Sequence, residues 1–422
     1  MVLQLPHYSN KMQKTTLHEE GRELKVLADY DVIVIGAGIA GCAAAVAASR
    51  VKGTRVCIVE NFCLPGGLAT IGNVIVYLPL CDGRGHQVCG GLAEAQSRMS
   101  VACEKEAKRN VGISPVPACW NKGGDLEERK KVRFRTEFNP MYFALELEKQ
   151  LRARHVKLIY AARFAGVIKE GKVIKAVVLE TKSGRIAMTC RAVVDASGDA
   201  DVCVAAGEKV ATSAKNVRCG WYYTNENDGM HLYRETDTIY YKPGDGKPPR
   251  YFNFDALNGI PSQIIASHDM MKDRMRQTLE VKGEMPFIAN IPTYPTFRMT
   301  RHLVGRVVMR ASDDHRWFSD TVGMTGDWRK AGPIFCIPFR ALAAVNTSNL
   351  IVAGRCMSTT GDNWDVMRVI PPCAVTGEAA GAAAAMLAQD SNALSFADLS
   401  IPALQRHLVS HKAIIDRSIL DK

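Results

Sequence analysis

The chain has 422 residues, which is enough for two subdomains around a shared core, and its 47% hydrophobic and 23% charged residues are typical of a globular enzyme. No apolar run reaches the roughly 18 residues needed to cross a bilayer, so we expect no membrane span. The net charge of +11 is scattered and accompanies no nucleic-acid motif. We interpret it as a basic surface that attracts phosphates and anionic substrates, and we expect no nucleic acid partner.

The 13 cysteines are an odd number without a regular framework, and no Cys-x-x-Cys pair occurs. This pattern argues against a zinc knuckle, an iron–sulfur cluster and a redox dithiol, so we expect no metal site. It is typical of a reducing compartment, and we therefore expect a cytoplasmic protein. Residues 1–29 contain no signal-peptide core and are interpreted as an arm that precedes the first strand.

The first element is a short β-branched strand at Asp31–Ile35, followed by the turn Gly36-Ala-Gly38-Ile-Ala-Gly41 and an alanine-rich helix. A second strand at 55–59 ends in Glu60. In a dinucleotide-binding βαβ unit, the three glycines permit a tight turn, close approach of a pyrophosphate and close helix–strand packing, while the helix N-terminus attracts the phosphates. Glu60 is placed to accept hydrogen bonds from a ribose, and its charge argues against NADP.

The rest of the chain alternates between core-like and irregular segments. The expected elements are a glycine-rich loop at 61–95, a helix from Pro140 to about Arg154, a strand at 156–160, a hairpin of strands 173–181 and 185–190, a core strand at 192–195, a strand at 350–353 and an Ala/Gly-rich helix at 376–389. Residues 205–330 are richer in Tyr, Pro, Met and charge and contain no run typical of a parallel strand. We interpret them as an insertion.

A second glycine-rich loop, Pro65-Gly-Gly-Leu-Ala-Thr70, follows Glu60 closely and favours FAD over NAD, because it can close over the pyrophosphate and the flavin side. Together the motifs resemble the FAD-dependent oxidoreductases of the glutathione-reductase-like fold, and more closely the bacterial group with a fumarate-reductase-like or thiazole-synthase-like nucleotide domain. The segments that carry this likeness are Leu64–Gly67, Tyr77–Pro79, Asp82-Gly83, Gly90–Glu94, Gly326–Arg329, Gly354–Cys356 and Arg368–Pro371.

The fold that we predict is α/β, with a Rossmann-like FAD-binding domain and an inserted, mainly β-containing substrate domain. The division is an arm at 1–29, a first FAD-binding segment with the hairpin at 30–204, the substrate domain at 205–330, and a second FAD-binding segment with C-terminal helices at 331–422. The residues expected to contact FAD are Gly36, Gly38, Ile39, Ala40, Gly41, Glu60, Asn61, Gly66, Gly67, Leu68, Ala69, Phe164, Ala196, Gly198, Asp199, Gly354, Arg355, Cys356, Pro372 and Cys373.

The resemblance implies a role for the segment around Pro372 and Cys373. In FAD enzymes of this fold a C-terminal helix points at the N1/O2 edge of the flavin, and its dipole stabilises the negative charge of the reduced ring. We expect this helix to start after the two prolines and to present free N–H groups. Cys356 follows Gly354-Arg355 and is expected near the flavin, as a covalent thioether link, a redox thiol or a buried filler.

The candidates for proton transfer and substrate binding are His86, Arg301, His302 and Asp362. They are accompanied by the neighbouring Arg84, Arg298, Asn363 and Trp364. Arg can hold a carboxylate or carbonyl, and His can move a proton while the flavin moves a hydride. A solvated or packed structural role is the alternative for each of them.

No second strand–glycine–helix motif that could hold NAD(P)H occurs in the sequence. We therefore expect electrons to pass between FAD and a small-molecule substrate, with an external electron acceptor or donor and an oligomer as further possibilities. The predicted function is hydride transfer to or from a small polar substrate that is anionic or carbonyl-bearing. The alternatives are a flavin monooxygenase and a flavin-carrying protein that binds tRNA or a protein partner.

Overall fold

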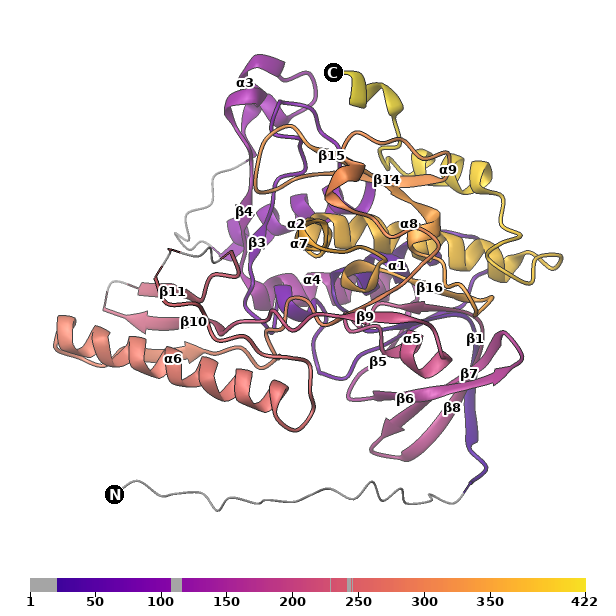
Figure 1. Cartoon of the computed structure of the whole chain (residues 1–422), viewed down its shortest axis with the longest axis horizontal. Helices are drawn as coiled ribbons and strands as arrows, with labels where there is room; N and C mark the ends of the chain where they lie inside the picture. The colour runs from indigo at the N-terminus through magenta and orange to yellow at the C-terminus, as the bar shows by residue number, and fades with distance from the viewer. Residues whose placement is uncertain (1–20, 108–115, 228, 241–243, 245) are drawn as a thin grey trace.

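The computed structural model describes residues 21–422, apart from residues 108–115, 228, 241–243 and 245 (Figure 1). Its centre is a seven-stranded sheet of order β5-β2-β1-β8-β7-β6, in which β16 also pairs with β8. The strands of this sheet are β1 (Lys25–Ile35), β2 (Val56–Val59), β5 (Lys157–Ile159), β6 (Arg163–Glu170), β7 (Val173–Thr181), β8 (Gly184–Asp195) and β16 (Leu350–Val352).

Five of these strands, β5, β2, β1, β8 and β16, run parallel. Their register places Ile35 opposite both Val59 and Asp195, and Asp195 opposite Val352. The strands β1, β2, β8 and β16 therefore all end at the same edge of the sheet. The segments that follow these four strands meet there. In open parallel sheets this edge is where ligands bind. The predicted Rossmann-like α/β core is confirmed.

The predicted hairpin is also confirmed, as the antiparallel strands β7 and β8. The strand expected separately at 192–195 is the end of β8, which runs without a break from Gly184 to Asp195. The first half of β8 pairs with β7, and its last residues lie between β1 and β16. One strand thus joins the antiparallel β6-β7-β8 sheet to the parallel core.

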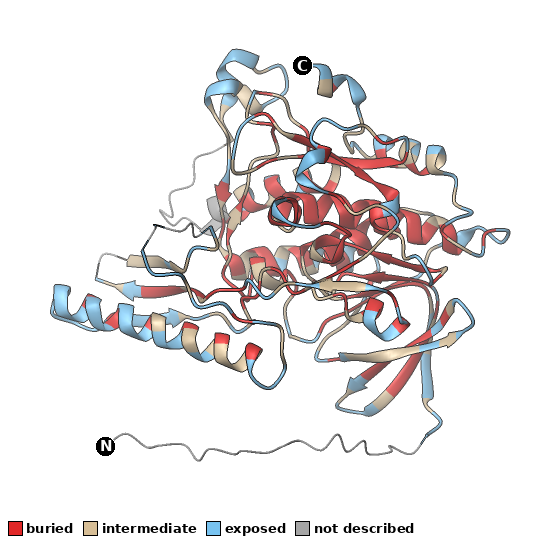
Figure 2. Ribbon diagram, viewed as in Figure 1, coloured by how far each residue is buried: buried red, intermediate tan, exposed pale blue. Residues whose placement is uncertain are grey.

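Helices α1 (Ile39–Ala48) and α8 (Ile370–Gln389) pack against each other and against the parallel strands. Every residue of α1 is buried, and Figure 2 shows α8 almost entirely buried as well. The contact depends on glycine, because a Cβ atom on Gly377 or Gly381 would lie only 2.2 Å from the carbonyl oxygen of Ala40 or 2.0 Å from that of Ala44, respectively. Small residues allow the two helices to touch at their backbones.

The inserted segment contains a three-stranded sheet of order β11-β10-β12 and one long helix, α6 (Gly259–Lys282), beside it (Figure 1). The sequence prediction missed this helix. Its buried positions include Gln263, Ser267 and Thr278 beside two methionines, so its inner face lacks the apolar stripe by which helices are detected. The strands of the segment are β9 (Val210–Thr212), β10 (Cys219–Glu226), β11 (Gly229–Thr236), β12 (Phe287–Asn290) and β13 (Arg301–Leu303).

The predicted boundary at residue 330 falls between β14 and β15, which pair with each other, and β14 also packs on α8. The predicted arm ends inside β1, whose first residue is Lys25, and residues 1–20 lie outside the described part. The domain division stays a prediction. The remaining elements are β3 (Val76–Tyr77), α2 (Gly91–Ala107), α3 (Leu126–Lys131), β4 (Thr136–Glu137), α4 (Pro140–Ala153), α5 (Asp201–Ala206), β14 (Thr321–Gly326), β15 (Ile334–Pro338), α7 (Asp362–Met367) and α9 (Ile401–Ser410).

Among the described residues, no helix combines the length and the apolar character that crossing a membrane requires. All 13 cysteines lie in the described part, and each of them is a free thiol.

The α1–α8 contact leads to a stability prediction. We expect Gly381→Ala to lower the free energy of unfolding by about 1–3 kcal/mol or more, because the new methyl group would meet backbone atoms that cannot rotate away. The matched control is Gly166→Ala, since Gly166 in β6 has no atom within 4 Å of an added Cβ. Urea denaturation of both variants checks this, and equal midpoints would contradict the glycine-dependent packing.

Candidate active site

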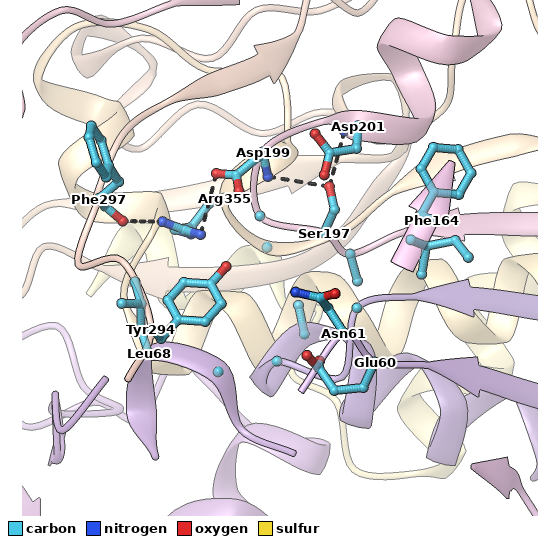
Figure 3. A pocket seen from close by; sticks show the side chains of 18 of the residues that line it. Glu60, Asn61, Leu68, Phe164, Ser197, Asp199, Asp201, Tyr294, Phe297 and Arg355 are labelled. Atoms are coloured by element: carbon cyan, nitrogen blue, oxygen red, sulfur yellow. Dashed lines mark hydrogen bonds and ion pairs between the residues drawn. The ribbon is translucent and has the colours of Figure 1, made fainter. Parts of the chain in front are cut away.

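The carboxyl ends of the parallel strands open into a cavity of about 810 Å³ (Figure 3). Segments from the whole length of the chain line it, including the insertion. Most residues expected to contact FAD are among its lining residues: Gly36, Gly38, Ile39, Ala40, Glu60, Asn61, Gly66, Gly67, Leu68, Ala69, Phe164, Ala196, Gly198, Asp199, Gly354, Arg355 and Cys373. Gly41, Cys356 and Pro372 do not line the cavity.

The first glycine turn has the geometry of a phosphate cradle. Gly36 has a positive φ of 94°, and a Cβ there would lie 2.6 Å from the carbonyl oxygen of Ala196. A Cβ on Gly41 would lie 1.8 Å from the carbonyl oxygen of Gly36, so this glycine serves helix–strand packing. Gly38 differs from both, because no atom beyond its own neighbours in the chain lies within 4 Å of its Cβ position. Its missing side chain leaves cavity space at the N-terminus of α1, where a pyrophosphate fits.

Glu60 is held at the end of β2 by two backbone donors. The N–H of Ala37 donates to Oε2 at 2.8 Å, and the N–H of Phe62 donates to Oε1 at 2.9 Å. Burial raises the pKa of this carboxyl group, while these N–H groups favour its ionised form. Each oxygen keeps a further lone pair. A fixed carboxylate at the cavity wall can therefore accept hydrogen bonds from ribose hydroxyl groups.

The start of α8 differs from the prediction. The helix begins at Ile370, before the two prolines and not after them, so Pro371 and Pro372 occupy positions whose N–H groups would otherwise be free. The N–H of Cys373 is already bonded to the carbonyl oxygen of Val369. Proline has no N–H, so only the N–H of Ile370 is left in the first turn. The helix dipole still points into the cavity, but the expected set of free donors is absent from this turn.

Arg355 forms part of the inner wall, as Figure 3 shows. Its guanidinium group donates to the carbonyl oxygen of Phe297 and lies 3.7 Å from the carboxylate of Asp199. A Cβ on Gly198 would lie 2.3 Å from Nη2 of Arg355, so Gly198 leaves room for this side chain. The carbonyl oxygen of Arg355 accepts a hydrogen bond from the indole of Trp364 at 3.1 Å. Arg355 thus joins the strand-end turns to the inserted segment.

Cys356 is fully buried behind this wall. Its sulfur accepts a hydrogen bond from the N–H of Ala200 at 3.3 Å and lies 3.9 Å from the Asp195 carboxylate. Burial raises the pKa of its thiol well above the ordinary value, as does the nearby Asp195 charge. Cys373 lines the cavity instead, and burial raises the pKa of its thiol to about 12. Of the three roles considered for Cys356, these contacts favour the buried filler.

Three of the four catalytic candidates do not line the cavity. His86 bonds the carboxylate of Asp82 at 2.9 Å, and Asp362 is exposed at the start of α7. His302 is buried, with Nδ1 2.7 Å from its neighbour's carbonyl oxygen and its ring packed edge-on against Trp364. Burial lowers the pKa of this histidine. These contacts favour structural roles for His302 and His86.

Arg301 does line the cavity, but its positive charge is paired with acidic neighbours. Its guanidinium group donates to the carbonyl oxygen of Asp199 at 2.8 Å and to the carboxylate of Asp201, and it stacks on Phe254. Burial and then the charge of Asp199 raise the pKa of Asp201 to about 7, although 41% of this side chain is exposed. Arg301 therefore balances negative charge on the cavity wall and is not an unpaired cation.

The sequence analysis missed several lining residues, some of them in β6, α5 and the insertion. Tyr294 lies beside Leu68 in Figure 3, and Phe297 lies at the upper left, on the far side of Arg355. Arg368 also lines the cavity. Arg368 stood in a quoted motif and could have been chosen from it. The residues from β6, α5 and the insertion could not, since no local pattern marks them: Arg163, Asp201, Val204, Ala205, Phe254, Ala256, Ile260, Tyr294, Pro295 and Phe297.

A family model described as FAD dependent oxidoreductase matches residues 31–220 and 262–408, which is most of the chain. The chain belongs to the FAD dependent oxidoreductase family. It is accordingly an enzyme, and its cofactor is FAD. The finer likeness to a fumarate-reductase-like or thiazole-synthase-like group stays a prediction.

No curated protein matches this flavoenzyme significantly. It is similar to the solved structure of p-nitrophenol 4-monooxygenase PnpA from Pseudomonas putida DLL-E4, with 9% identity, a TM-score of 0.46 and 93% of each chain covered. It is also similar to a geranylgeranyl bacteriochlorophyll reductase-like protein from Thermoplasma acidophilum, with 13% identity, a TM-score of 0.42, and 93% of this chain and 90% of that chain covered. Similarities of this size carry no argument about the reaction.

The open space at Gly38 leads to a binding prediction. We expect Gly38→Val to abolish FAD retention while leaving the fold intact, because its side chain would enter the cavity and not the protein core. Flavin absorbance after purification and circular dichroism measure the two effects separately. Gly166→Val is the control for a valine placed in open space, and a Gly38→Val protein that keeps stoichiometric FAD would contradict the proposed pyrophosphate position.

The position of Cys356 leads to a second prediction. Because its thiol points toward Asp195 and Ala200, we expect acid precipitation to release all the flavin into the supernatant. Cys356→Ala should also retain FAD. A yellow acid precipitate that loses its colour in Cys356→Ala would establish the covalent link instead.

Proposed function

We propose that this FAD-dependent enzyme transfers a hydride between the flavin and a small polar substrate that is anionic or carbonyl-bearing. One observation supports this most directly. A single cavity of about 810 Å³ runs from Glu60 and the Gly38 turn to Arg368 and the start of α8, so one ligand site continues into another. The sequence contains no second dinucleotide motif that would bring NAD(P)H to this cavity.

Each part of the wall has a role in this proposal. Glu60 would hold the ribose, and the Gly38 turn would hold the pyrophosphate. Leu68, Tyr294 and Phe297 would flank the ring system and exclude water from it, which strengthens electrostatic interactions inside the site. When bound, FAD supplies a ring that accepts or donates a hydride and a proton.

Tyr294 adds a polar group to the otherwise apolar part of this wall. Burial raises the pKa of its phenol well above the ordinary value, and the nearby Asp199 charge acts in the same direction. The phenol therefore stays protonated at neutral pH. It can donate a hydrogen bond to a carbonyl or carboxylate oxygen and fix its orientation, which hydride transfer requires.

Anaerobic flavin absorbance tests the proposal. We expect a polar carboxylate or carbonyl compound, screened from a metabolite set, to bleach the oxidised flavin in the absence of oxygen, or to re-oxidise flavin that dithionite has reduced. Tyr294→Phe should retain FAD and slow this step about tenfold or more, in keeping with the loss of one hydrogen bond. Bleaching only by NAD(P)H, followed by oxygen insertion, would establish a monooxygenase instead. Salt-sensitive co-purification with RNA and no bleaching would favour the binding protein.

A further inference from the structure

One irregular segment of the insertion, residues 293–301, forms part of the cavity wall and is called the strap below. It leads from β12 into β13. Four of its residues line the cavity, namely Tyr294, Pro295, Phe297 and Arg301. The strap and the turns after the parallel strands therefore line the same cavity, and a ligand that fills this cavity contacts both.

The second half of the strap is bonded to the turns that follow β8 and β16. The hydroxyl group of Thr300 donates to the carboxylate of Asp199 at 2.6 Å, and Nε of Arg301 donates to the carbonyl oxygen of Asp199 at 2.8 Å. The guanidinium group of Arg355 donates to the carbonyl oxygen of Phe297, as Figure 3 shows. Each of these bonds has a charged partner, which makes it stronger than a bond between neutral groups.

The first half of the strap is attached to the segment that follows β2. The N–H of Thr293 donates to the carbonyl oxygen of Ile71 at 2.9 Å. The ring of Tyr294 lies 5.3 Å, between centroids, from the ring of Phe62. The backbone N–H of Phe62 in turn holds Glu60, the expected ribose acceptor. The strap thus contacts the segments after three different strands that meet at the cavity.

Other groups of the strap bind the rest of the insertion. The hydroxyl group of Thr296 donates to the carbonyl oxygen of Cys219 at 2.6 Å, and the amide group of Gln263 donates to this hydroxyl oxygen at 3.2 Å. The amide group of Asn216 donates to the carbonyl oxygen of Met299 at 2.7 Å. All of these partners are neutral. The strap is therefore fixed between the cavity and the insertion, and two adjacent sets of contacts can be changed separately.

We propose that the strap retains the bound FAD, so that the insertion belongs to the cofactor site and does not serve the substrate alone. Thr300 is the positioning residue of this device, because its bond to Asp199 holds the strap against the turn after β8. FAD that contacts both the strap and the strand ends leaves slowly as long as these bonds stay closed. The proposal concerns the cofactor and is independent of the reaction that the flavin performs.

The rate of FAD release tests this proposal. The FAD-loaded protein is diluted, and the rise in flavin fluorescence is followed as free FAD appears. Thr300→Val replaces the hydroxyl group with a methyl group and should speed release about tenfold to a hundredfold, as loss of a hydrogen bond to a charged group predicts. Thr300→Ser keeps a hydroxyl group and should release FAD slowly, like the unmodified protein.

Thr296→Val is the matched control. Thr296 and Thr300 belong to the same strap and are 6% and 0% exposed, but Thr296 binds the insertion and not the strand-end turns. Its release rate should equal that of the unmodified protein, because the bonds to Asp199 and Arg355 remain. Unchanged release from Thr300→Val, fast release from Thr300→Ser, or equal acceleration in both valine variants would overturn the proposal, the last because the insertion would then have loosened as a whole.

Hydrogen exchange decides the question if Thr300→Val does not fold. In the unmodified protein, the amide of Thr293 should exchange more slowly with FAD bound than after FAD has been removed, since its bond to Ile71 closes the strap. The amides of α6 are the reference and should exchange equally in both states. Equal exchange at Thr293, or the same change in α6 as at Thr293, would overturn the proposal.

Discussion

The structure depends on the close approach of segments that lie far apart in the chain, in two cases by more than 300 residues. Gly36 lies against Ala196, Gly41 against Gly36, and Gly354 and Gly377 against Ala40. In each pair an added Cβ would meet its neighbour at less than 3 Å. These contacts bring together the turns after β1, β8 and β16 with the start of α8. Without them the strand ends would not meet, and no cavity would exist at this edge of the sheet.

Such packing separates two uses of glycine that look alike in the sequence. Gly36 and Gly41 are required by the protein itself, because their Cβ positions are occupied by backbone atoms. Gly38, in the middle of the same motif, is surrounded by open space and is required only by what the cavity holds. The cofactor therefore explains the one glycine of the motif that the fold does not.

Local patterns predicted the parallel core, the β7–β8 hairpin and most of the cofactor wall, because each of these follows from strand periodicity and glycine turns. They did not predict α6, whose inner face contains Gln263, Ser267 and Thr278. They also gave no sign that His86, His302 and Asp362, which were chosen for their chemistry, do not line the cavity. The burial and the partners of these residues are decided by segments far away in sequence. His302 packs on Trp364, a contact between residues 62 positions apart that no local pattern encodes.

The polar groups around the cavity differ between its two ends. At the nucleotide end, backbone N–H groups hold Glu60, and Arg301 and Arg355 face the acidic pair Asp199 and Asp201. A buried charge is tolerated only when it is paired, so this end is already balanced before a substrate arrives. At the other end two prolines remove N–H groups from the start of α8, and Arg368, which is paired with Asp365, lines the cavity. A polar group of a ligand at this end is therefore met by side chains such as Arg368 more than by the backbone of α8.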